Sequence, residues 1–387
     1  MLIVRLVCAL SALLCLLSMN HQTAAADPST VAVFVGTYTG GDSKGIYRFD
    51  LDTTTGKASL PSLAAEVMSP SFLAISPDRR FLYAVSEVDA FQGKKTGGVT
   101  AFAIDPKTGA LTTLNAESVG GAGPCHLVVD KEGKNVLVAN YGGGSVAVLP
   151  IGTDGRVKPL SSFVQHQGSS ADKGRQGEPH AHSINLDKGN RFAFVADLGL
   201  DKILVYKFDP KAGTITPNSV GSAELSPGSG PRHFAFHPSG KYAYVINELN
   251  STVTVFDYDA GKGILTQVQS LSSLPTNSKA TNYPAEIVVH PTGRFVYGSN
   301  RGHDTIAAFK VDEANGMLTP VGHQGTGVKN PRNFAIEPTG KFLLVANQDG
   351  NTVVVFKINQ ETGNLDPTGQ TIKVAKPVCV RFWWPIE

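Results

Sequence analysis

One pattern recurs along the chain at a regular spacing, and it constrains the fold more than any other feature. It consists of an apolar run after a proline, a turn rich in Pro, Asp and Gly, a second apolar run that ends in Asn, Glu or Asp, and a Val-rich run. Residues 230–266 hold the clearest copy. The copies are led by Pro70, Pro124, Pro179, Pro231, Pro284, Pro331 and, as a fragment, Pro377. This spacing of about 50 residues suits four short strands joined by turns.

The two ends of the chain complement each other. Residues 31–38 match the second apolar run of the pattern, so the first unit lacks its first run. Residues 377–382 match only that missing run. Pairing of the two segments would close a ring of sheets and leave no open edge. The sequence therefore predicts an all-β fold, a seven-bladed β-propeller of four-stranded antiparallel blades, closed by pairing of the C-terminal strand with the N-terminal blade.

Composition agrees with a single propeller domain over residues 27–387. The 41 glycines and 23 prolines fall at periodic turns between apolar runs, which argues against disorder. The 34 basic residues nearly balance the 32 acidic residues, and the sequence has no cluster of Lys and Arg that could bind the phosphates of a nucleic acid. We therefore expect no nucleic-acid partner. We also expect a monomer. Cys125 and Cys379 lie in separate units, and we expect both to be unpaired.

Residues 1–26 differ from the repeats. Arg5 precedes an apolar stretch at residues 6–17, and three alanines stand at positions 24–26. This order is typical of a secretory signal peptide, and the apolar run is short for a membrane span. We therefore expect cleavage after Ala26, export to the periplasm or the outside of the cell, and no stable membrane insertion. An uncleaved anchor is the alternative.

The long insertions lie on one face of the predicted ring. If the first strand of each unit runs down from its leading proline, the loops between second and third strands and the loops between units lie at the top. The insertions fall in such loops, at residues 88–97, 163–178 and 272–283. Loop variation on one face of a rigid scaffold is where function usually resides. The top face is therefore the expected functional face.

Polar side chains gather at the same face when two strand positions are compared around the ring. The second residue after each leading proline, with the fourth copy aligned on its Ser183 strand, reads Phe72, His126, His182, His233, Glu286, Asn333 and Cys379. The ends of the second strands read Thr37, Glu87, Asn140, Asp197, Glu248, Asn300 and Asn347. Beside them lie His180, Arg232, Arg301 and Arg332. Because blade faces are apolar, this concentration of charge indicates a site at the upper mouth of the central channel.

Simpler roles remain open for each of these residues. Polar strand ends can cap turns or bind the backbone of a neighbouring blade, which applies to Asn140, Asp197, Asn247, Asn300 and Asn347. The three histidines can form hydrogen bonds between blades, and the two arginines that follow prolines can tie blades together. The loop residues Lys173 and Arg175 are expected to be solvated.

At these residues the chain resembles a known family. Residues 230–233, 236–238, 241–244, 247–251 and 179–182 are similar to recognisable stretches of the seven-bladed lactonase family, which includes bacterial 6-phosphogluconolactonase and fungal carboxymuconate cyclase. The resemblance covers residues 31–384 and implies that the chain opens or forms a lactone without a required metal or cofactor. The proposed working groups of that family carry over to His182, Arg232, His233 and Glu248, and then to Arg301.

A mechanism for lactone opening can be written on these residues. His182 or Glu248 could activate water as a base near neutral pH, and Arg232 could stabilise the oxyanion. Arg301 or Arg332 could bind a carboxylate or phosphate of the substrate. His126, His180, Glu286 and Asn300 are the further residues expected to contact the small lactone. Because export would separate the protein from a cytoplasmic sugar phosphate, an unphosphorylated aldonolactone or another small lactone is the alternative to the phosphorylated substrate.

Two other classes of function remain alternatives. His126, His182, His233 and Glu286 offer three imidazoles and a carboxylate, which are plausible ligands for a Zn-like metal. A non-catalytic exported binding propeller is the other alternative, because this fold has many functions. Partner binding of the Trp-Asp repeat type is not indicated, because the two tryptophans are Trp383 and Trp384 at the end of the chain.

Overall fold

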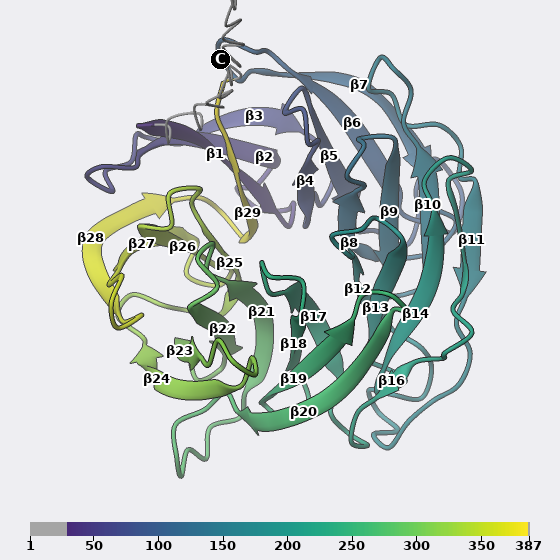
Figure 1. Ribbon diagram of the computed structural model, residues 1–387. Coiled ribbons are helices and arrows are strands. Elements are labelled where there is room, and N and C mark those ends of the chain that lie inside the picture. The colour runs from purple at the N-terminus through teal and green to yellow at the C-terminus, as the bar shows by residue number, and fades with distance from the viewer. Residues whose placement is uncertain (1–28, 386–387) are drawn as a thin grey trace, which may run out of the picture.

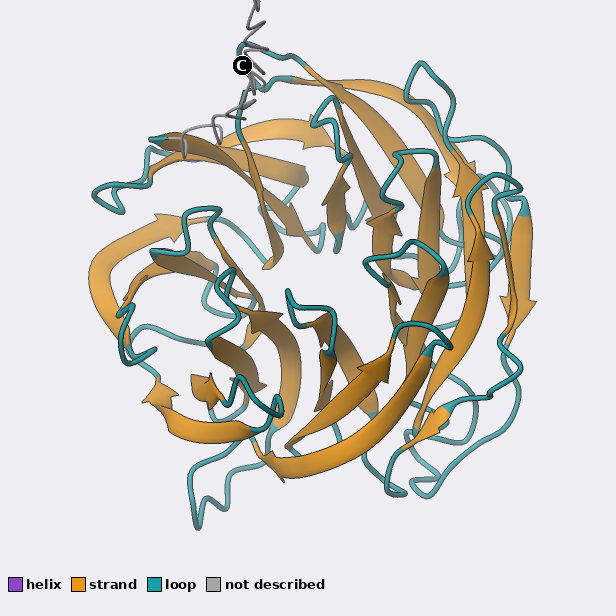
Figure 2. Cartoon of the chain, in the orientation of Figure 1, coloured by secondary structure: helices purple, strands orange, loops and turns teal. Residues whose placement is uncertain are grey.

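The computed structural model describes residues 29–385, and within this range the strands form seven sheets arranged in a ring (Figure 1). Over the same range the secondary structure consists of strands joined by turns and loops (Figure 2). Each sheet is an antiparallel blade of four strands, and one blade carries a short additional strand. The predicted seven-bladed β-propeller is confirmed. The predicted signal peptide at residues 1–26 lies outside the described residues.

The chain passes through the blades in order, from the inner strand of each blade outward. The first blade holds β29 (Pro377–Trp383), β1 (Thr30–Thr37), β2 (Gly45–Asp52) and β3 (Ser62–Glu66). The second holds β4 (Leu73–Ile75), β5 (Phe81–Ser86), β6 (Gly98–Ile104) and β7 (Leu111–Ser118). The third holds β8 (Pro124–Val129), β9 (Asn135–Asn140), β10 (Ser145–Pro150) and β11 (Ser162–Gln165).

The remaining four blades repeat this arrangement. The fourth holds β12 (Ala181–Leu186), β13 (Phe192–Asp197), β14 (Lys202–Asp209) and β15 (Thr214–Pro217), with β16 (Ala223–Glu224) also paired to β14. The fifth holds β17 (Pro231–Phe236), β18 (Tyr242–Asn247), β19 (Thr252–Asp259) and β20 (Ile264–Ser272). The sixth holds β21 (Tyr283–Val289), β22 (Phe295–Arg301), β23 (Thr305–Val311) and β24 (Leu318–Gln324). The seventh holds β25 (Pro331–Ile336), β26 (Phe342–Asn347), β27 (Thr352–Ile358) and β28 (Leu365–Lys373).

The C-terminal strand closes the ring as the sequence predicts. β29 pairs antiparallel with β1, so that Val380 lies opposite Val35 and Trp383 lies opposite Ala32. Val380 is fully buried, and the Trp383 indole donates a hydrogen bond to the carbonyl of Arg79 in the second blade at 2.8 Å. The inner strand of the first blade is therefore supplied by the last residues of the chain.

Blades pack face to face, which explains the nearly continuous apolar runs of the second strands. All six residues of β9, β13, β18 and β26 are buried. Contacts cross from blade to blade, as where the ring of Phe194 in the fourth blade stacks on Phe234 in the fifth at 5.6 Å between centroids. A strand that is covered on both faces has no side exposed to solvent, so its polar and apolar residues do not alternate.

Tyrosine hydroxyls tie neighbouring blades together through the outer hairpins. The hydroxyls of Tyr83, Tyr244 and Tyr297 donate to the carbonyls of Gly155, Gly316 and Gly363 in the next blade, at 2.9–3.0 Å. Each of these glycines has a positive φ of 71° to 81°, a conformation that glycine adopts without steric cost. The Gly turns of the repeat therefore close the hairpin and also present an acceptor to the adjacent blade.

Most inner strands contain a β-bulge near their beginning. On the ladders with the second strands, the register skips one residue in four blades, at Cys125, His182, Arg232 and Arg332. Ladder pairing on β29 skips Val378 in the same way. A bulge re-aims a side chain without breaking the rest of the ladder. These bulges lie at the end of the channel where the functional site is found.

Within residues 29–385, no helix is long and apolar enough to cross a lipid bilayer.

Candidate active site

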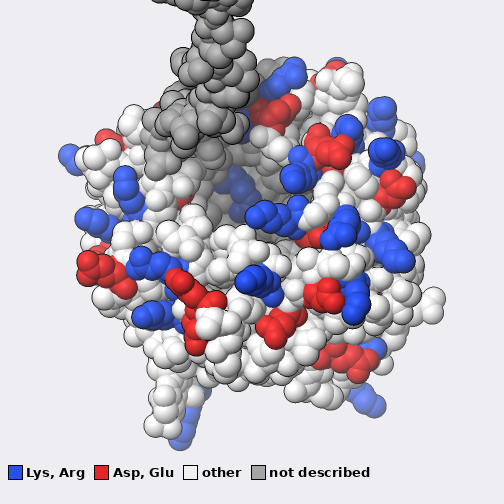
Figure 3. Space-filling view, in the orientation of Figure 1, with Lys and Arg blue, Asp and Glu red and all other residues white. Residues whose placement is uncertain are grey.

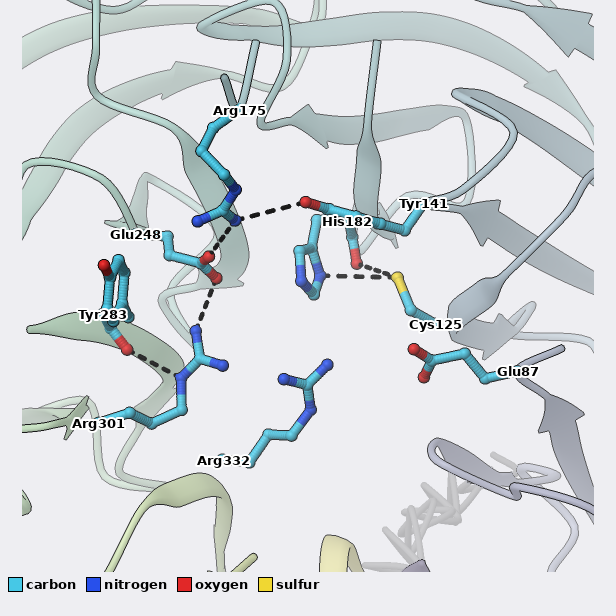
Figure 4. Close-up of a pocket in the computed structure, with 9 residues that line it drawn as sticks. All are labelled: Glu87, Cys125, Tyr141, Arg175, His182, Glu248, Tyr283, Arg301 and Arg332. Carbon is cyan, nitrogen blue, oxygen red and sulfur yellow. Dashed lines mark hydrogen bonds and ion pairs between the residues drawn. The ribbon is translucent and has the colours of Figure 1, made fainter. Parts of the chain in front are cut away.

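A polar cavity lies at the mouth of the central channel. Its volume is about 350 Å³, and eight of the nine residues that line it are charged or carry an aromatic ring. The space-filling view shows Lys and Arg side chains around a hollow near the centre of this face (Figure 3). Side chains from several blades point into the cavity (Figure 4). The upper mouth predicted from the strand ends is therefore where the structure places a cavity.

The bulge residues supply one part of the cavity wall. Cys125, His182 and Arg332 all line the cavity, and each is the residue skipped by the ladder of its inner strand. Arg232 occupies the same bulge position in the fifth blade but is only 2% exposed and lies behind Glu248. His182 therefore matches Arg232 and Arg332 in register, whereas the sequence alignment paired it with His126 and His233.

The ends of the second strands supply another part. Glu87, Tyr141 and Glu248 directly follow β5, β9 and β18, and Arg301 is the last residue of β22. Comparison of the repeat units in the sequence places Asn140 and Asn300 level with Glu87 and Glu248. In the structure the equivalent residues are one position further along, at Tyr141 and Arg301, because the asparagines end the ladder.

The strand-end asparagines have the capping roles that remained open. The amide of Asn140 donates to Ser145 Oγ at 3.1 Å, and Asn347 donates to the Gly327 carbonyl and to Thr352 Oγ1 at 2.9 and 3.1 Å. Asn300 is fully buried and binds Ser273, with its amide donating to the backbone carbonyl and its oxygen accepting from the hydroxyl, both at 2.8 Å. Asn300 is not among the residues that line the cavity.

Glu248 is the common acceptor of three guanidinium groups. Its Oε1 accepts from Arg175 Nη2 at 2.6 Å, and its Oε2 accepts from Arg301 Nη2 at 2.7 Å and Arg232 Nε at 3.0 Å. Burial alone would raise the pKa of Glu248, but Arg301, Arg232 and Arg175 outweigh it and lower this pKa to about 2. Glu248 is therefore an ionised anchor at neutral pH and a poor proton acceptor.

Each guanidinium around Glu248 is also held by a second group. Arg232 Nη1 donates to the Ala285 carbonyl at 2.7 Å, and Arg301 Nε donates to the Tyr283 carbonyl at 2.8 Å. Burial and the charge of Arg232 lower the pKa of Arg301 to about 9, which leaves it protonated at neutral pH. Charge-assisted hydrogen bonds of this kind fix the direction of the guanidinium.

Arg175 was expected to be solvated, and this expectation is wrong. The residue lies in the long loop between β11 and β12, and this loop places its guanidinium against Glu248 and in the cavity wall. The side chain is 37% exposed, so it lies at the outer rim. The predicted top-face insertion therefore contributes a cation to the site.

Arg332 differs from the other cavity arginines in its partners. Among residues 29–385 it forms no ion pair within 4 Å, and its guanidinium carbon lies 5.2 Å from the centre of the Tyr38 ring. In Figure 4 the guanidinium points toward the middle of the cavity. It is therefore a cation available to an anionic group of a ligand.

His182 lies at the floor of the cavity beside Cys125. The Cys125 sulfur is 3.6 Å from His182 Nδ1 and 3.3 Å from the His182 carbonyl oxygen. Burial and the nearby charge of Arg232 lower the pKa of His182 well below its usual value, so the imidazole is neutral at pH 7. Burial also raises the pKa of the Cys125 thiol, which argues against a thiolate nucleophile.

A second layer of polar groups fills the channel beneath the cavity. His126 and His182 each contact the His233 ring, at centroid distances of 5.2 and 5.4 Å. His233 Nδ1 is 2.7 Å from Glu286 Oε1, and Glu286 Oε2 accepts from the Asn333 amide. His126, His233 and Glu286 are buried and do not line the cavity. The structure thus brings the predicted residues together, but in two layers.

The four residues predicted as alternative metal ligands are not arranged as a metal-binding site. Within residues 29–385 no cluster of three or more His, Cys, Asp or Glu has a geometry that could hold an ion. His126 Nδ1 accepts from the amide of Ile184 at 3.3 Å, and His233 Nδ1 is bonded to Glu286. These bonds between blades are the simpler role left open for the histidines.

His180 lies above this layer, outside the residues that line the cavity. Its ring stacks on Tyr141 at 4.5 Å between centroids, and its Nδ1 is 3.0 Å from the Tyr141 carbonyl. It therefore supports Tyr141, which itself lines the cavity. Tyr141 and Tyr283 were missed from sequence because neither residue type stands out beside a His or Arg.

The buried histidines predict a stability that depends on pH. Burial lowers the pKa of His126 and His182, whereas the unfolded chain protonates them near 6.5. The unfolded state therefore binds more protons below pH 6.5, and each histidine should lower the free energy of unfolding by about 1.4 kcal/mol per pH unit. The contribution of these histidines to the free energy of unfolding should be fully present above pH 6.5 and should decline as the pH falls below it.

Thermal unfolding of the wild type and His182→Gln between pH 7.5 and 5.0 checks this expectation. The free energy of unfolding of the variant should fall less steeply with pH, because up to one proton fewer is taken up on unfolding. Other groups such as Glu286 titrate in both proteins. Equal slopes for the two proteins would contradict the role given to His182.

Comparison with known proteins identifies the family. The family model described as "Lactonase, 7-bladed beta-propeller" matches residues 32–382. The 6-phosphogluconolactonase of Bacillus subtilis is 39% identical over 349 residues, which cover 90% of this chain and 97% of that protein.

Solved structures agree with the sequence match. A putative 6-phosphogluconolactonase from Bacteroides fragilis superposes with a TM-score of 0.86 at 41% identity, covering 93% of this chain and 99% of that chain. The periplasmic gluconolactonase of Pseudomonas aeruginosa gives a TM-score of 0.87 at 33% identity, covering 92% of this chain and all of that chain. With the fold, the cavity and these matches in agreement, the chain belongs to the seven-bladed β-propeller lactonase family.

Proposed function

We propose that the chain hydrolyses the ring ester of a small sugar lactone in the cavity at the channel mouth. The observation that carries the proposal is the gathering of Arg175, Arg301 and Arg332 around one cavity in a member of the lactonase family. Hydrolysis of a lactone develops negative charge on the carbonyl oxygen, and fixed cations in a partly enclosed site stabilise such charge strongly. The relatives named 6-phosphogluconolactonase support the same reaction.

The cavity suits a small polar substrate. Its volume of about 350 Å³ lies at the lower end of the range for small-molecule sites. Tyr141 and Tyr283 offer ring faces and hydroxyls to a sugar ring, and His182 offers a neutral imidazole to a sugar hydroxyl. A hexose-derived lactone has hydroxyl groups on most of its ring carbons, which matches this polar wall.

Roles follow from the fixed charges. We assign the oxyanion to Arg301 and Arg332, because both line the cavity, and we give Arg232 the role of positioning Glu248 from behind. This replaces the direct oxyanion role that the sequence suggested for Arg232. Glu248 in turn holds Arg175 and Arg301 in place. The pKa of about 2 keeps Glu248 in that role rather than in proton transfer.

We also propose an unphosphorylated aldonolactone as the substrate of an exported protein. The support is the order of residues 1–26, which is typical of a secretory signal, together with the likeness to the Pseudomonas protein titled a periplasmic gluconolactonase. A periplasmic or extracellular protein would meet free sugar lactones more readily than phosphorylated ones.

The assay compares glucono-δ-lactone with its 6-phosphate at equal concentrations. Acid release is followed in a weakly buffered solution, with the spontaneous rate subtracted. We expect hydrolysis of both lactones above the spontaneous rate, with the higher kcat/KM for the unphosphorylated compound. Absence of turnover on either lactone would overturn the proposed function, and a strong preference for the phosphate would overturn only the proposed substrate.

A further inference from the structure

Two carboxylates line the cavity, and their surroundings differ. Glu248 uses both oxygens to bind guanidinium groups. Glu87 lies on the other side of the cavity, as Figure 4 shows, and no Lys or Arg among residues 29–385 forms an ion pair with it. Of the two carboxylates, Glu87 is therefore the one free to take a proton from water.

Glu87 is held by neutral donors. The Tyr38 hydroxyl lies 2.9 Å from Oε1 and 3.0 Å from Oε2, and the Ser71 hydroxyl donates to Oε2. Burial raises the pKa of Tyr38, so the phenol keeps its proton and remains a donor. A carboxylate has about four acceptor positions, which leaves room on Oε1 for a water molecule.

The placement of Glu87 follows from the same strand-end geometry as that of Glu248. Glu87 follows β5 directly, and its backbone NH donates to the Ser69 carbonyl at 3.0 Å. Tyr38 holds the equivalent place after β1 in the neighbouring blade. Two adjacent blades therefore fix the direction of the carboxylate, and Arg332 over the Tyr38 ring lies between it and Arg301 in Figure 4.

We propose that Glu87 is the general base that activates the attacking water, an inference that rests on the proposed lactone hydrolysis. A water bound to Glu87 would approach the lactone carbonyl from the side opposite Arg301, with Arg332 between the two (Figure 4). The attacking oxygen and the developing oxyanion are then served by groups of opposite charge.

Glu87, water and the arginines account for every proton and electron pair in the reaction. Glu87 takes a proton from water while the water oxygen bonds to the carbonyl carbon, and the carbonyl electron pair moves to the oxygen facing Arg301 and Arg332. The tetrahedral intermediate collapses, and the bond from the carbonyl carbon to the ring oxygen breaks. Glu87 returns its proton to that oxygen, which leaves as a hydroxyl. The product acid then releases its own proton to solvent.

Glu87→Gln tests the proposal, because the amide keeps the shape of the side chain but cannot accept the proton. We expect kcat/KM on glucono-δ-lactone to fall by roughly 10²–10⁴-fold, mainly through kcat, as for loss of a general base. Glu224→Gln is the matched control, since Glu224 is an exposed partner of Lys202 on the outer edge of the fourth blade. The control should keep wild-type kinetics.

Chemical rescue separates a base from a structural residue. In Glu87→Ala, formate can enter the space of the missing carboxylate and should restore turnover at least tenfold, in a saturable manner. Glu248→Ala should show no such recovery, because formate cannot reproduce the anchor for three arginines. Enzyme-free formate blanks correct for direct catalysis of lactone hydrolysis.

The outcomes distinguish the two proposals. If the wild type is active and Glu87→Gln keeps more than a third of its kcat/KM, the role of Glu87 is overturned while lactone hydrolysis stands. Loss of activity without rescue by formate also overturns it, since a structural role would give that result. If the Glu87 variants do not fold, Tyr38→Phe decides, with a kcat decrease of about tenfold at constant KM expected and no change overturning the proposal. A wild type that opens no lactone overturns both.

Discussion

Glu248→Gln is expected to reduce kcat/KM by about 10²–10³-fold and to lower the free energy of unfolding by about 3–5 kcal/mol. The side chain of Arg232 is 2% exposed, and in the variant its charge would remain buried without a carboxylate. Loss of one partner from a buried ion pair costs more than the pair itself contributes, because the remaining charge keeps its desolvation penalty. Arg175 and Arg301 would lose the acceptor that directs them.

Kinetics and thermal unfolding measured on the same preparation check this prediction. KM should rise along with the fall in kcat, because the arginines that contact the substrate lose their fixed direction. Glu224→Gln serves again as the control, since its carboxylate is 71% exposed and its ion pair with Lys202 is screened by solvent. A Glu248→Gln protein with the stability of the wild type would show that the buried charges are compensated in another way.

Val380→Asp is expected to destabilise the protein by about 4 kcal/mol or more and to reduce the yield of folded protein sharply. Val380 is fully buried in the strand that closes the ring and lies opposite Val35. An aspartate there would place an unpaired charge between the first and seventh blades. Without that strand the first blade would expose the edge of β1, and an open edge invites association with other chains.

Thr371→Asp is the matched control for ring closure. Thr371 is exposed on β28, the outer strand of the neighbouring blade, so the same new charge is solvated there. Soluble yield and the midpoint of denaturant unfolding should be near those of the wild type for Thr371→Asp and far below them for Val380→Asp. Similar behaviour of the two variants would mean that closure by β29 contributes little to stability.

The architecture could be predicted from sequence because the repeat carries it redundantly. The turn glycines, the buried second strands and the complementary ends each indicate the same ring, so an error in one copy does not change the result. The cavity location followed from the same periodicity. Individual contacts did not, because one bulge residue shifts the register of an inner strand and moves His182 into line with Arg232 instead of His233.

Loop residues were the harder part of the site. Arg175 binds Glu248 across 73 positions of sequence, and a lone arginine in a polar loop carries no sign of such a partner. Glu87 and Tyr38 could have been found, because both follow the ends of second strands as Glu248 does. Comparison of the repeat units places Glu87 level with Glu248. A single carboxylate without a basic residue next to it in the sequence does not by itself indicate a catalytic role.

The bulge in the inner strands has a consequence for how this scaffold can change. The residue at each bulge has no partner on the adjacent strand, so its side chain can be exchanged without altering the pairing of the others. In this chain the position holds a thiol, an imidazole and two guanidiniums in different blades. Evolution can therefore vary the chemistry of the cavity one blade at a time while the propeller itself remains intact.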